Sequence, residues 1–174
     1  MITVRPAKAD ELDSVMDFYS ELIESMRGSE FKPEWEMGVY PTEQLLKDAI
    51  ESRTLFLAHL DSHLVGTMIM NHVWEPEYEK AKWRIEARND EVMAVHLLGV
   101  SSAYQGRGIA KQMVSSLIEM CGKSSIKAIR LDVLKKNAPA AKLYASMGFR
   151  FIESVKIFYE DTGLTDFLLY ELVI

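Results

Sequence analysis

The sequence has one cysteine, five prolines and no long apolar run among its 174 residues. Because Cys121 is alone, no internal disulfide can form, which suits a reducing compartment. No apolar stretch approaches the roughly 18 residues needed to span a bilayer. The N-terminal residues also lack the basic and apolar segments of a signal peptide. These absences favour a cytoplasmic protein that does not enter the membrane.

Excess positive charge is missing as well. The chain carries 20 Lys and Arg against 26 Asp and Glu, which gives a net charge of −6. Such a balance provides no general attraction to nucleic acid or anionic lipid, so neither is expected as a partner. A hydrophobic fraction of 48% and the chain length indicate one globular domain over residues 1–174.

Hydrophobic periodicity predicts the element order β-α-α-β-β-β-α-β-α-β-β. Asp10 is expected to cap the first helix, and Gly148 to end the last one. The expected helices are 10–26, 42–50, 106–121 and 138–147, and the expected strands are 2–5, 54–60, 64–71, 92–101, 129–133, 149–155 and 166–173. This order predicts one mixed sheet with helices on both faces rather than a doubly wound nucleotide fold.

A glycine-rich turn joins the strand at 92–101 to the following helix. Its residues are Gln105, Gly106, Arg107, Gly108, Ile109 and Ala110. The first N–H groups of a helix have no internal partner, and the helix dipole makes that end an anion site. The two glycines would let a pyrophosphate approach the backbone, and the arginine adds a cation.

Two better-known phosphate motifs fail at this turn. A P-loop requires Gly-Lys followed by Ser or Thr, which Lys111-Gln112 does not supply. A dinucleotide fingerprint requires a third glycine, and position 111 is lysine. A Gly-x-Gly pair alone also occurs by chance, so the turn by itself does not establish phosphate binding.

The longer pattern around this turn resembles the GNAT superfamily of N-acetyltransferases. The matching residues run from Gly99-Val100 through Tyr104 to Ala110. A second matching segment, Asn137–Phe149, contains Asn-x-x-Ala, then Tyr144 and Gly148-Phe149. The resemblance covers nearly the whole chain. It implies an α/β (α+β) fold with a mixed, mostly antiparallel central sheet of about seven strands.

The same resemblance implies a binding site for acetyl-CoA as cosubstrate. The backbone of 105–110 would bind its pyrophosphate, and Val100 would pair with the pantetheine arm. Asn137 would hydrogen-bond the pantetheine amide. Backbone N–H groups around the Leu98–Val100 bulge could stabilise the developing oxyanion.

Catalysis needs a proton donor for the departing thiolate and an acceptor for the amine proton. Tyr144 is the leading acid in the matched motif, although a tyrosine on a helix face could also be core packing. His96 shares a face with Leu98 and Val100 if the strand is regular, so it is the leading base. Many relatives carry a glutamate where Ala94 stands here, and Glu91 is a weaker candidate.

The expected acceptor is the primary amine of a small molecule or peptide, attacked directly in a ternary complex. No metal is expected, because the histidines form no recognisable ligand set. The alternatives are a non-catalytic acyl-CoA sensor and an enzyme that uses a longer acyl-CoA. Either a monomer or a homodimer fits the sequence. Aromatic residues that could line the acceptor pocket, or simply pack, are Trp35, Tyr40, Trp74, Tyr78, Trp83 and Tyr159.

Overall fold

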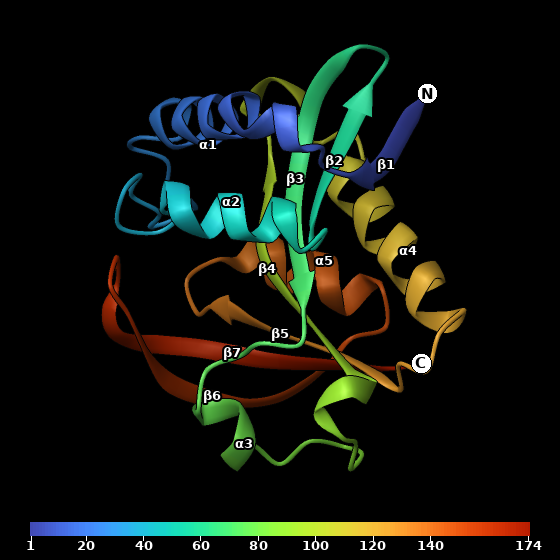
Figure 1. Ribbon diagram of the computed structural model, residues 1–174. Coiled ribbons are helices and arrows are strands. Elements are labelled where there is room, and N and C mark those ends of the chain that lie inside the picture. Colours follow the sequence, from blue (N-terminus) through green and yellow to red (C-terminus); the bar gives the residue numbers. More distant parts are fainter. The chain divides into compact units, whose positions relative to one another are not determined.

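The strands of the computed structural model, which describes residues 1–174, follow the order β1-β2-β3-β4-β5-β7-β6 in one seven-stranded sheet (Figure 1). The β4–β5 pair is parallel, whereas the β1–β2, β2–β3, β5–β7 and β6–β7 pairs are antiparallel. The expected α+β class with a mixed, mostly antiparallel sheet is therefore confirmed.

The element order is the predicted one, with one additional short helix, α3. The strands are β1 (Ile2–Pro6), β2 (Leu55–Leu60), β3 (His63–Asn71), β4 (Val92–Val100), β5 (Ala128–Leu134), β6 (Arg150–Tyr159) and β7 (Gly163–Val173). The helices are α1 (Leu12–Ser25), α2 (Glu43–Glu51), α3 (Glu77–Lys80), α4 (Ile109–Gly122) and α5 (Ala138–Ser146). Short 3-10 helices lie at Ala9–Glu11, Asn89–Glu91 and Ser102–Tyr104. No helix has both the length and the apolar character that a membrane span requires.

The chain divides into two units, and each is made of two stretches of sequence. The first unit comprises residues 1–70 and 96–116, and the second comprises 71–95 and 117–174. Strand β4 contributes its first half to the second unit and its second half to the first. The expectation of a single domain over 1–174 stays a prediction.

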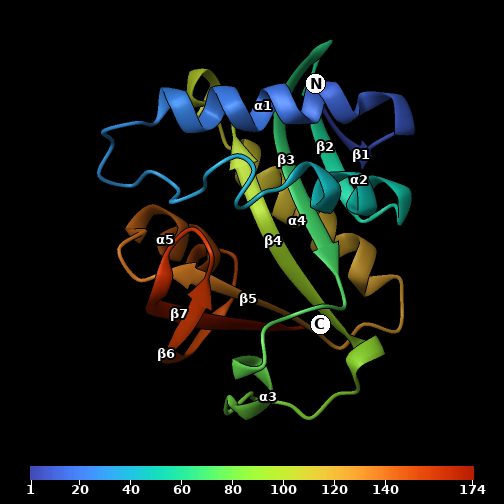
Figure 2. The same cartoon turned by 60° about the vertical axis from the view of Figure 1, so that its left-hand side comes forward.

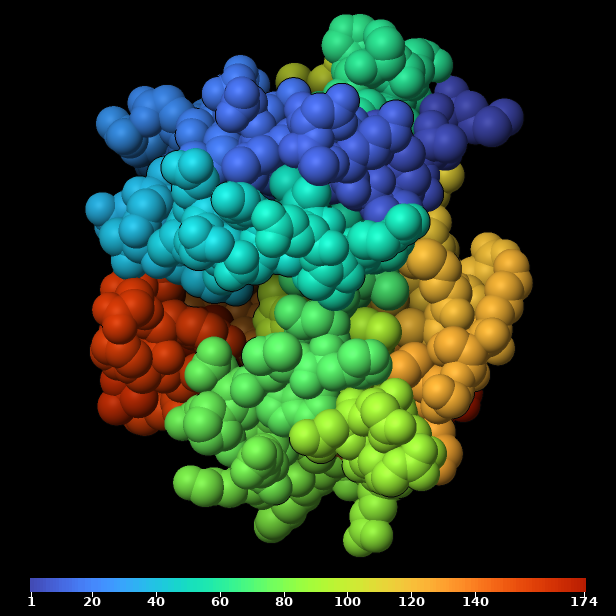
Figure 3. Space-filling model, in the orientation of Figure 1, coloured from blue at the N-terminus to red at the C-terminus, as the bar shows by residue number.

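In the first unit, α1 and α2 lie side by side against one face of β2 and β3 (Figures 1 and 3). The fully buried side chains of Val15, Leu46 and Leu57 belong to the core between them. Helix α4 packs on the opposite face. Gly66 of β3 lies so close to Met113 of α4 that a Cβ added at Gly66 would be only 2.7 Å from the Met113 sulfur. Helices therefore cover both faces of this part of the sheet.

In the second unit, α3 packs on β6 and β7 (Figure 2). Its Tyr78 is 2% exposed. Within the sheet, Arg130 Nε of β5 donates to Glu171 Oε1 of β7 at 3.0 Å in a buried ion pair. Arg130 also donates to the Ile85 carbonyl at 2.9 Å, which ties the segment after α3 to this pair. Glu171 also accepts the backbone N–H of Arg84 at 2.8 Å. The segment after α3 is thus attached to β5 and β7.

The sequence reading placed several element ends incorrectly. The first helix is not capped by Asp10, because a 3-10 turn precedes it and Glu11 accepts the Lys8 N–H instead at 2.8 Å. The fourth helix begins at Ile109 rather than Gly106, since Gly106 and Gly108 have left-handed φ angles of 75° and 77°. The last two strands are longer than predicted and meet in a hairpin. Gly148, with a φ of 91°, ends α5 as expected.

Candidate functional site

The turn before α4 presents open backbone. Gly106 and Gly108 both adopt left-handed φ angles, and an added Cβ at either would meet nothing within 4 Å. The Gln112 N–H donates to the Gly108 carbonyl at 3.0 Å, which makes this the first bond of the helix. The N–H groups of the first turn, from Ile109 onward, therefore lack partners within the helix and lie next to an uncovered loop.

Neighbouring side chains hold this turn in place. The Gln105 amide donates to the Val100 carbonyl at 3.1 Å, which joins the turn to the end of β4. The Arg107 guanidinium lies over the Tyr104 ring at 5.1 Å from its centroid. The Ser101 N–H donates to the Val65 carbonyl at 3.0 Å and fixes the end of β4 on β3. The expected cofactor-binding residues from Val100 to Ala110 thus form one continuous structural feature.

The chemistry of this turn fits the pyrophosphate of a coenzyme A thioester. A diphosphate needs several N–H donors and a positive potential, and the helix start offers both. The left-handed glycines leave space where side chains would otherwise cover the backbone. Arg107 adds a cation beside the same turn.

Strand β4 is irregular at the point where the resemblance places the thioester. Leu97 has a φ of 51°, so side chains do not simply alternate across residues 96–98. His96 was expected to share a face with Leu98 and Val100 only if the strand is regular. The left-handed Leu97 shows that the strand is not regular there. His96, Leu98 and Val100 are each partly buried. The resemblance places a bulge at Leu98–Val100, and the left-handed Leu97 directly precedes those residues.

Tyr144 lies on α5 with its ring packed edge-to-face on Phe149, at a centroid distance of 5.3 Å. Burial raises the pKa of Tyr144 far above its ordinary value, and the charge of Asp132 raises it further. The phenol is therefore protonated at neutral pH. Asn137 begins the same helix, and its side-chain oxygen accepts the Ala140 N–H at 3.2 Å. This capping bond leaves the Asn137 amide N–H groups for a ligand.

Asp132 is a candidate that the sequence reading missed. It lies on β5, where its Oδ2 accepts hydrogen bonds from Tyr78 at 2.8 Å and from Tyr159 at 3.1 Å. Its charge also acts on Tyr144. The sequence feature that could have identified Asp132 is its position between Leu131 and Val133, because a carboxylate is unusual in a strand that is otherwise almost entirely buried.

Glu91, the weaker candidate for the base, is held by two basic side chains. Glu91 forms ion pairs with Lys127 at 2.8 Å and Arg88 at 3.1 Å. The hydrogen bond from Lys127 lowers the pKa of Glu91, which makes it a poor base. Cys121 is buried in α4, and burial raises the pKa of its thiol to about 11, so it is not an activated nucleophile.

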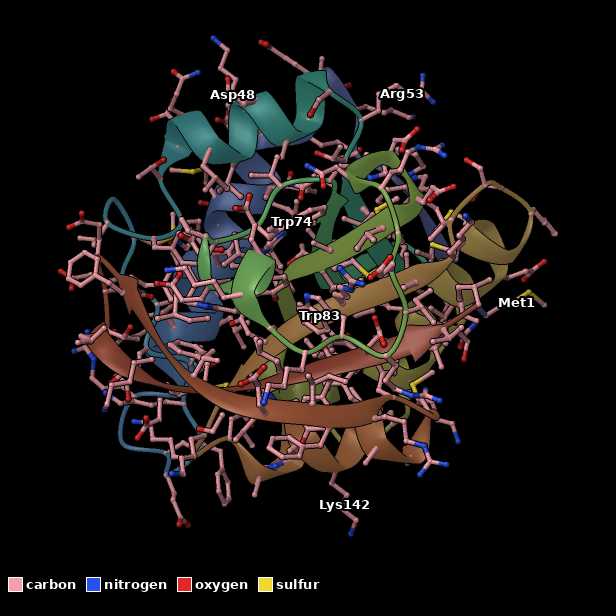
Figure 4. All side chains as sticks on the ribbon, turned by 90° about the horizontal axis from the view of Figure 1, so that it is seen from below. Met1, Asp48, Arg53, Trp74, Trp83 and Lys142 are labelled. Carbon is pink, nitrogen blue, oxygen red and sulfur yellow. The ribbon has the colours of Figure 1, made fainter.

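The candidate pocket aromatics are packed within their own units. Trp35 packs edge-to-face on Tyr19 at 5.7 Å, and Tyr40 lies against the same core in the first unit. In the second unit, Trp74 and Trp83 flank α3 and both contact the Tyr78 ring (Figure 4). No group of three or more His, Cys, Asp or Glu side chains is arranged to hold a metal ion.

The profile described as "Acetyltransferase (GNAT) family" matches residues 16–149. The N-alpha-acetyltransferase RimI of Mycobacterium tuberculosis is 33% identical over 69 residues. That match covers 40% of this chain and 42% of RimI, so the chain aligns with less than half of this curated relative.

Solved structures share the whole fold at low identity. A GNAT family acetyltransferase from Streptococcus agalactiae has a TM-score of 0.82 and 20% identity, over 99% of this chain and 95% of its own. YncA from Salmonella typhimurium, solved with its cofactor acetyl-CoA, has a TM-score of 0.71 and 14% identity. That likeness covers 99% of this chain and 94% of YncA.

Proposed function

The chain belongs to the Acetyltransferase (GNAT) family, and from this premise we propose that it transfers an acetyl group from acetyl-CoA to a primary amine. The acceptor is a small molecule or a peptide, and the amine attacks directly in a ternary complex. The observation that carries this proposal is the turn before α4. Its left-handed glycines and unpaired helix N–H groups suit the pyrophosphate of the acetyl donor.

The chemistry forms a carbon–nitrogen bond and breaks the carbon–sulfur bond of the thioester. The amine must lose a proton, and the departing thiolate must gain one. Tyr144 supplies the second proton, since burial keeps its phenol protonated at neutral pH. The raised pKa keeps the proton on the phenol but makes it a weaker acid, so the proton is transferred only as negative charge develops on the sulfur when the carbon–sulfur bond breaks. Backbone N–H groups around Leu98–Val100 stabilise the oxyanion.

Two residues are candidates for taking the amine proton. His96 lies on β4 beside the irregular Leu97. Asp132 is an ionisable group on β5 whose charge acts on the proposed acid. Its carboxylate is oriented by hydrogen bonds from the Tyr78 and Tyr159 phenols.

A cationic amine is the acceptor class that these surroundings favour. Burial raises the pKa of Glu75, and the negative charges of Glu77 and Asp132 add to the shift. Such a concentration of carboxylates attracts a protonated amine before it is deprotonated for attack. RimI is an N-alpha-acetyltransferase, so peptide N-termini belong in the first panel with polyamines, amino acids and aminoglycosides.

Calorimetric titration with acetyl-CoA and with longer acyl-CoAs, followed by mass spectrometry of the amine panel, tests this function. We expect acetyl-CoA to bind and one amine class to gain an acetyl group. Preference for a long-chain acyl-CoA in both measurements would overturn the choice of donor. Tight binding without a modified amine would instead support an acyl-CoA sensor.

A further inference from the structure

The irregular point in β4 is held by a residue from α1. The Tyr19 hydroxyl donates to the Leu97 carbonyl at 2.8 Å, across 78 positions of sequence. Leu97 is the residue with the left-handed φ of 51°. A leucine in that conformation is strained, so it persists only where surrounding contacts hold it. The hydrogen bond from Tyr19 is one such contact.

Tyr19 is rigidly placed for this contact. Its side chain is fully buried, and its ring packs edge-to-face on Phe18 at 5.6 Å and on Trp35 at 5.7 Å. Burial raises the pKa of Tyr19, so its phenol stays protonated and remains a donor throughout the neutral range. The phenol therefore acts as a fixed hydrogen-bond donor to the strand.

The same helix contacts β4 again two residues further on. A Cβ added at Gly99 would lie 2.8 Å from Leu22 Cδ2 and 3.4 Å from ring atoms of Phe18 and Trp35. A larger residue at this position would have to displace the Leu22 side chain. Helix α1 thus fixes the strand at two points, by a hydrogen bond at Leu97 and by packing at Gly99.

We propose that Tyr19 is a positioning residue for acetyl-CoA: its bond to the Leu97 carbonyl maintains the left-handed bulge and thereby orients the backbone N–H groups of Leu98–Val100. This inference rests on the proposed function, in which those groups meet the pantetheine arm and the thioester. Without the bond, the strained leucine can relax toward an extended conformation. The peptide groups that follow it would then rotate away from the donor.

The test compares Tyr19→Phe with Thr54→Val in the full chain. Phenylalanine keeps the ring contacts and removes only the donor. Thr54 lies in the same unit between α2 and β2, and its hydroxyl also donates to a backbone carbonyl, that of Ala49 at 3.2 Å, so valine is a matched removal of one such hydrogen bond. The readouts are calorimetric affinity for acetyl-CoA and amide hydrogen exchange at Leu98, Gly99 and Val100 in the ligand-free protein.

We expect Tyr19→Phe to weaken acetyl-CoA binding about tenfold, the size associated with one lost hydrogen bond. Exchange at the three amides should quicken by a similar factor, while Thr54→Val leaves both readouts unchanged. Unchanged affinity and exchange in Tyr19→Phe would overturn the inference. Equal losses in both variants would also overturn it, because they would report general loosening of the core.

The two hypotheses fail in distinguishable ways. If the unmodified protein does not bind acetyl-CoA, the proposed function fails, whatever the exchange data show. If it binds acetyl-CoA and Tyr19→Phe binds equally well, the proposed function survives and the positioning role of Tyr19 is wrong.

Discussion

Tyr144 is the side chain on which the proposed chemistry depends most directly. Replacing it with phenylalanine keeps the ring against Phe149 and removes the proton donor. We expect kcat to fall about 10²-fold, the low end for general acid–base catalysis, with little change in acetyl-CoA affinity. Steady-state kinetics paired with calorimetry measure the two effects separately.

Tyr170→Phe is the matched control for this variant. Tyr170 is also a buried tyrosine of the second unit and also packs against a phenylalanine ring, at 5.9 Å from Phe151. We expect its turnover to match that of the unmodified protein. Equal turnover in Tyr144→Phe and the control would mean that Tyr144 is only a packing residue.

The two candidate bases are separated by their pH–rate profiles. We expect Asp132→Asn to lower kcat/KM about 10²-fold and to remove the acidic limb of the profile, because asparagine cannot accept the amine proton. His96→Gln should retain that limb. If the limb disappears in His96→Gln and persists in Asp132→Asn, the assignment of the base is reversed.

The Arg5–Glu11 ion pair gives a stability prediction with a defined pH window. Arg5 donates two hydrogen bonds to Glu11, at 2.6 and 2.8 Å, and lowers the pKa of Glu11 from 4.5 to about 2. A depressed carboxylate pKa stabilises the fold above the unfolded-state value, and this contribution is lost as the pH falls toward the folded-state value.

Urea unfolding of Glu11→Gln measures this contribution. At pH 7 we expect the variant to be less stable by up to about 1 kcal/mol, the upper range for a partly exposed pair. The difference should shrink between pH 4.5 and about 2, where Glu11 itself becomes protonated. A difference that is independent of pH across this window would show that the ion pair is not its source.

Individual site residues differ in how readily the sequence identifies them. Tyr144 and Asn137 stand in a recognisable motif, so their selection needed no structure. Asp132 has no motif of its own, and its importance comes from Tyr78 and Tyr159, which are distant in sequence. Glu91 stands at the entrance of a strand, which makes it a candidate base in the sequence, and its partner Lys127 lies on a different segment, so the pattern does not reveal the ion pair.

At the scale of elements, the turn before α4 gives the clearest prediction. Gly108→Ala adds a methyl group that meets no neighbour, so its effect comes from the left-handed φ of 77°. That conformation costs a residue with a Cβ about 1–2 kcal/mol. We expect a loss of stability of this size and, because the turn shifts, acetyl-CoA binding weakened about tenfold by calorimetry.

Gly163→Ala controls for the backbone strain alone. Gly163 lies at the β6–β7 hairpin with a φ of 64°, and an added Cβ there also meets nothing within 4 Å. It should lose comparable stability and keep full acetyl-CoA affinity. If both alanine variants bind acetyl-CoA as well as the unmodified protein does, the turn is not the pyrophosphate site.

The periodicity of apolar residues predicted the helices and strands well. It predicted poorly the positions at which the backbone changes direction. The apolar pattern reports burial, so it identified the strands and helices in their correct order. It contains no information on φ, and it therefore extended α4 back over Gly106 and Gly108. For the same reason it treated β4 as regular through Leu97, whose conformation depends on Tyr19 in a distant helix.

At the scale of the whole molecule, the family assignment rests on segments from both units. The turn at 105–110 belongs to the first unit, and Asn137–Phe149 belongs to the second. The family profile spans both of them, from residue 16 to 149. The family assignment therefore does not depend on either unit alone.

The central claim is that this chain catalyses acetyl transfer to an amine, and free thiol released from acetyl-CoA measures that reaction directly. The assay compares release with and without each member of a panel of peptides, polyamines, amino acids and aminoglycosides. We predict release that depends on one amine class and saturates with its concentration. Release that is no faster with any amine than with buffer alone would contradict the account.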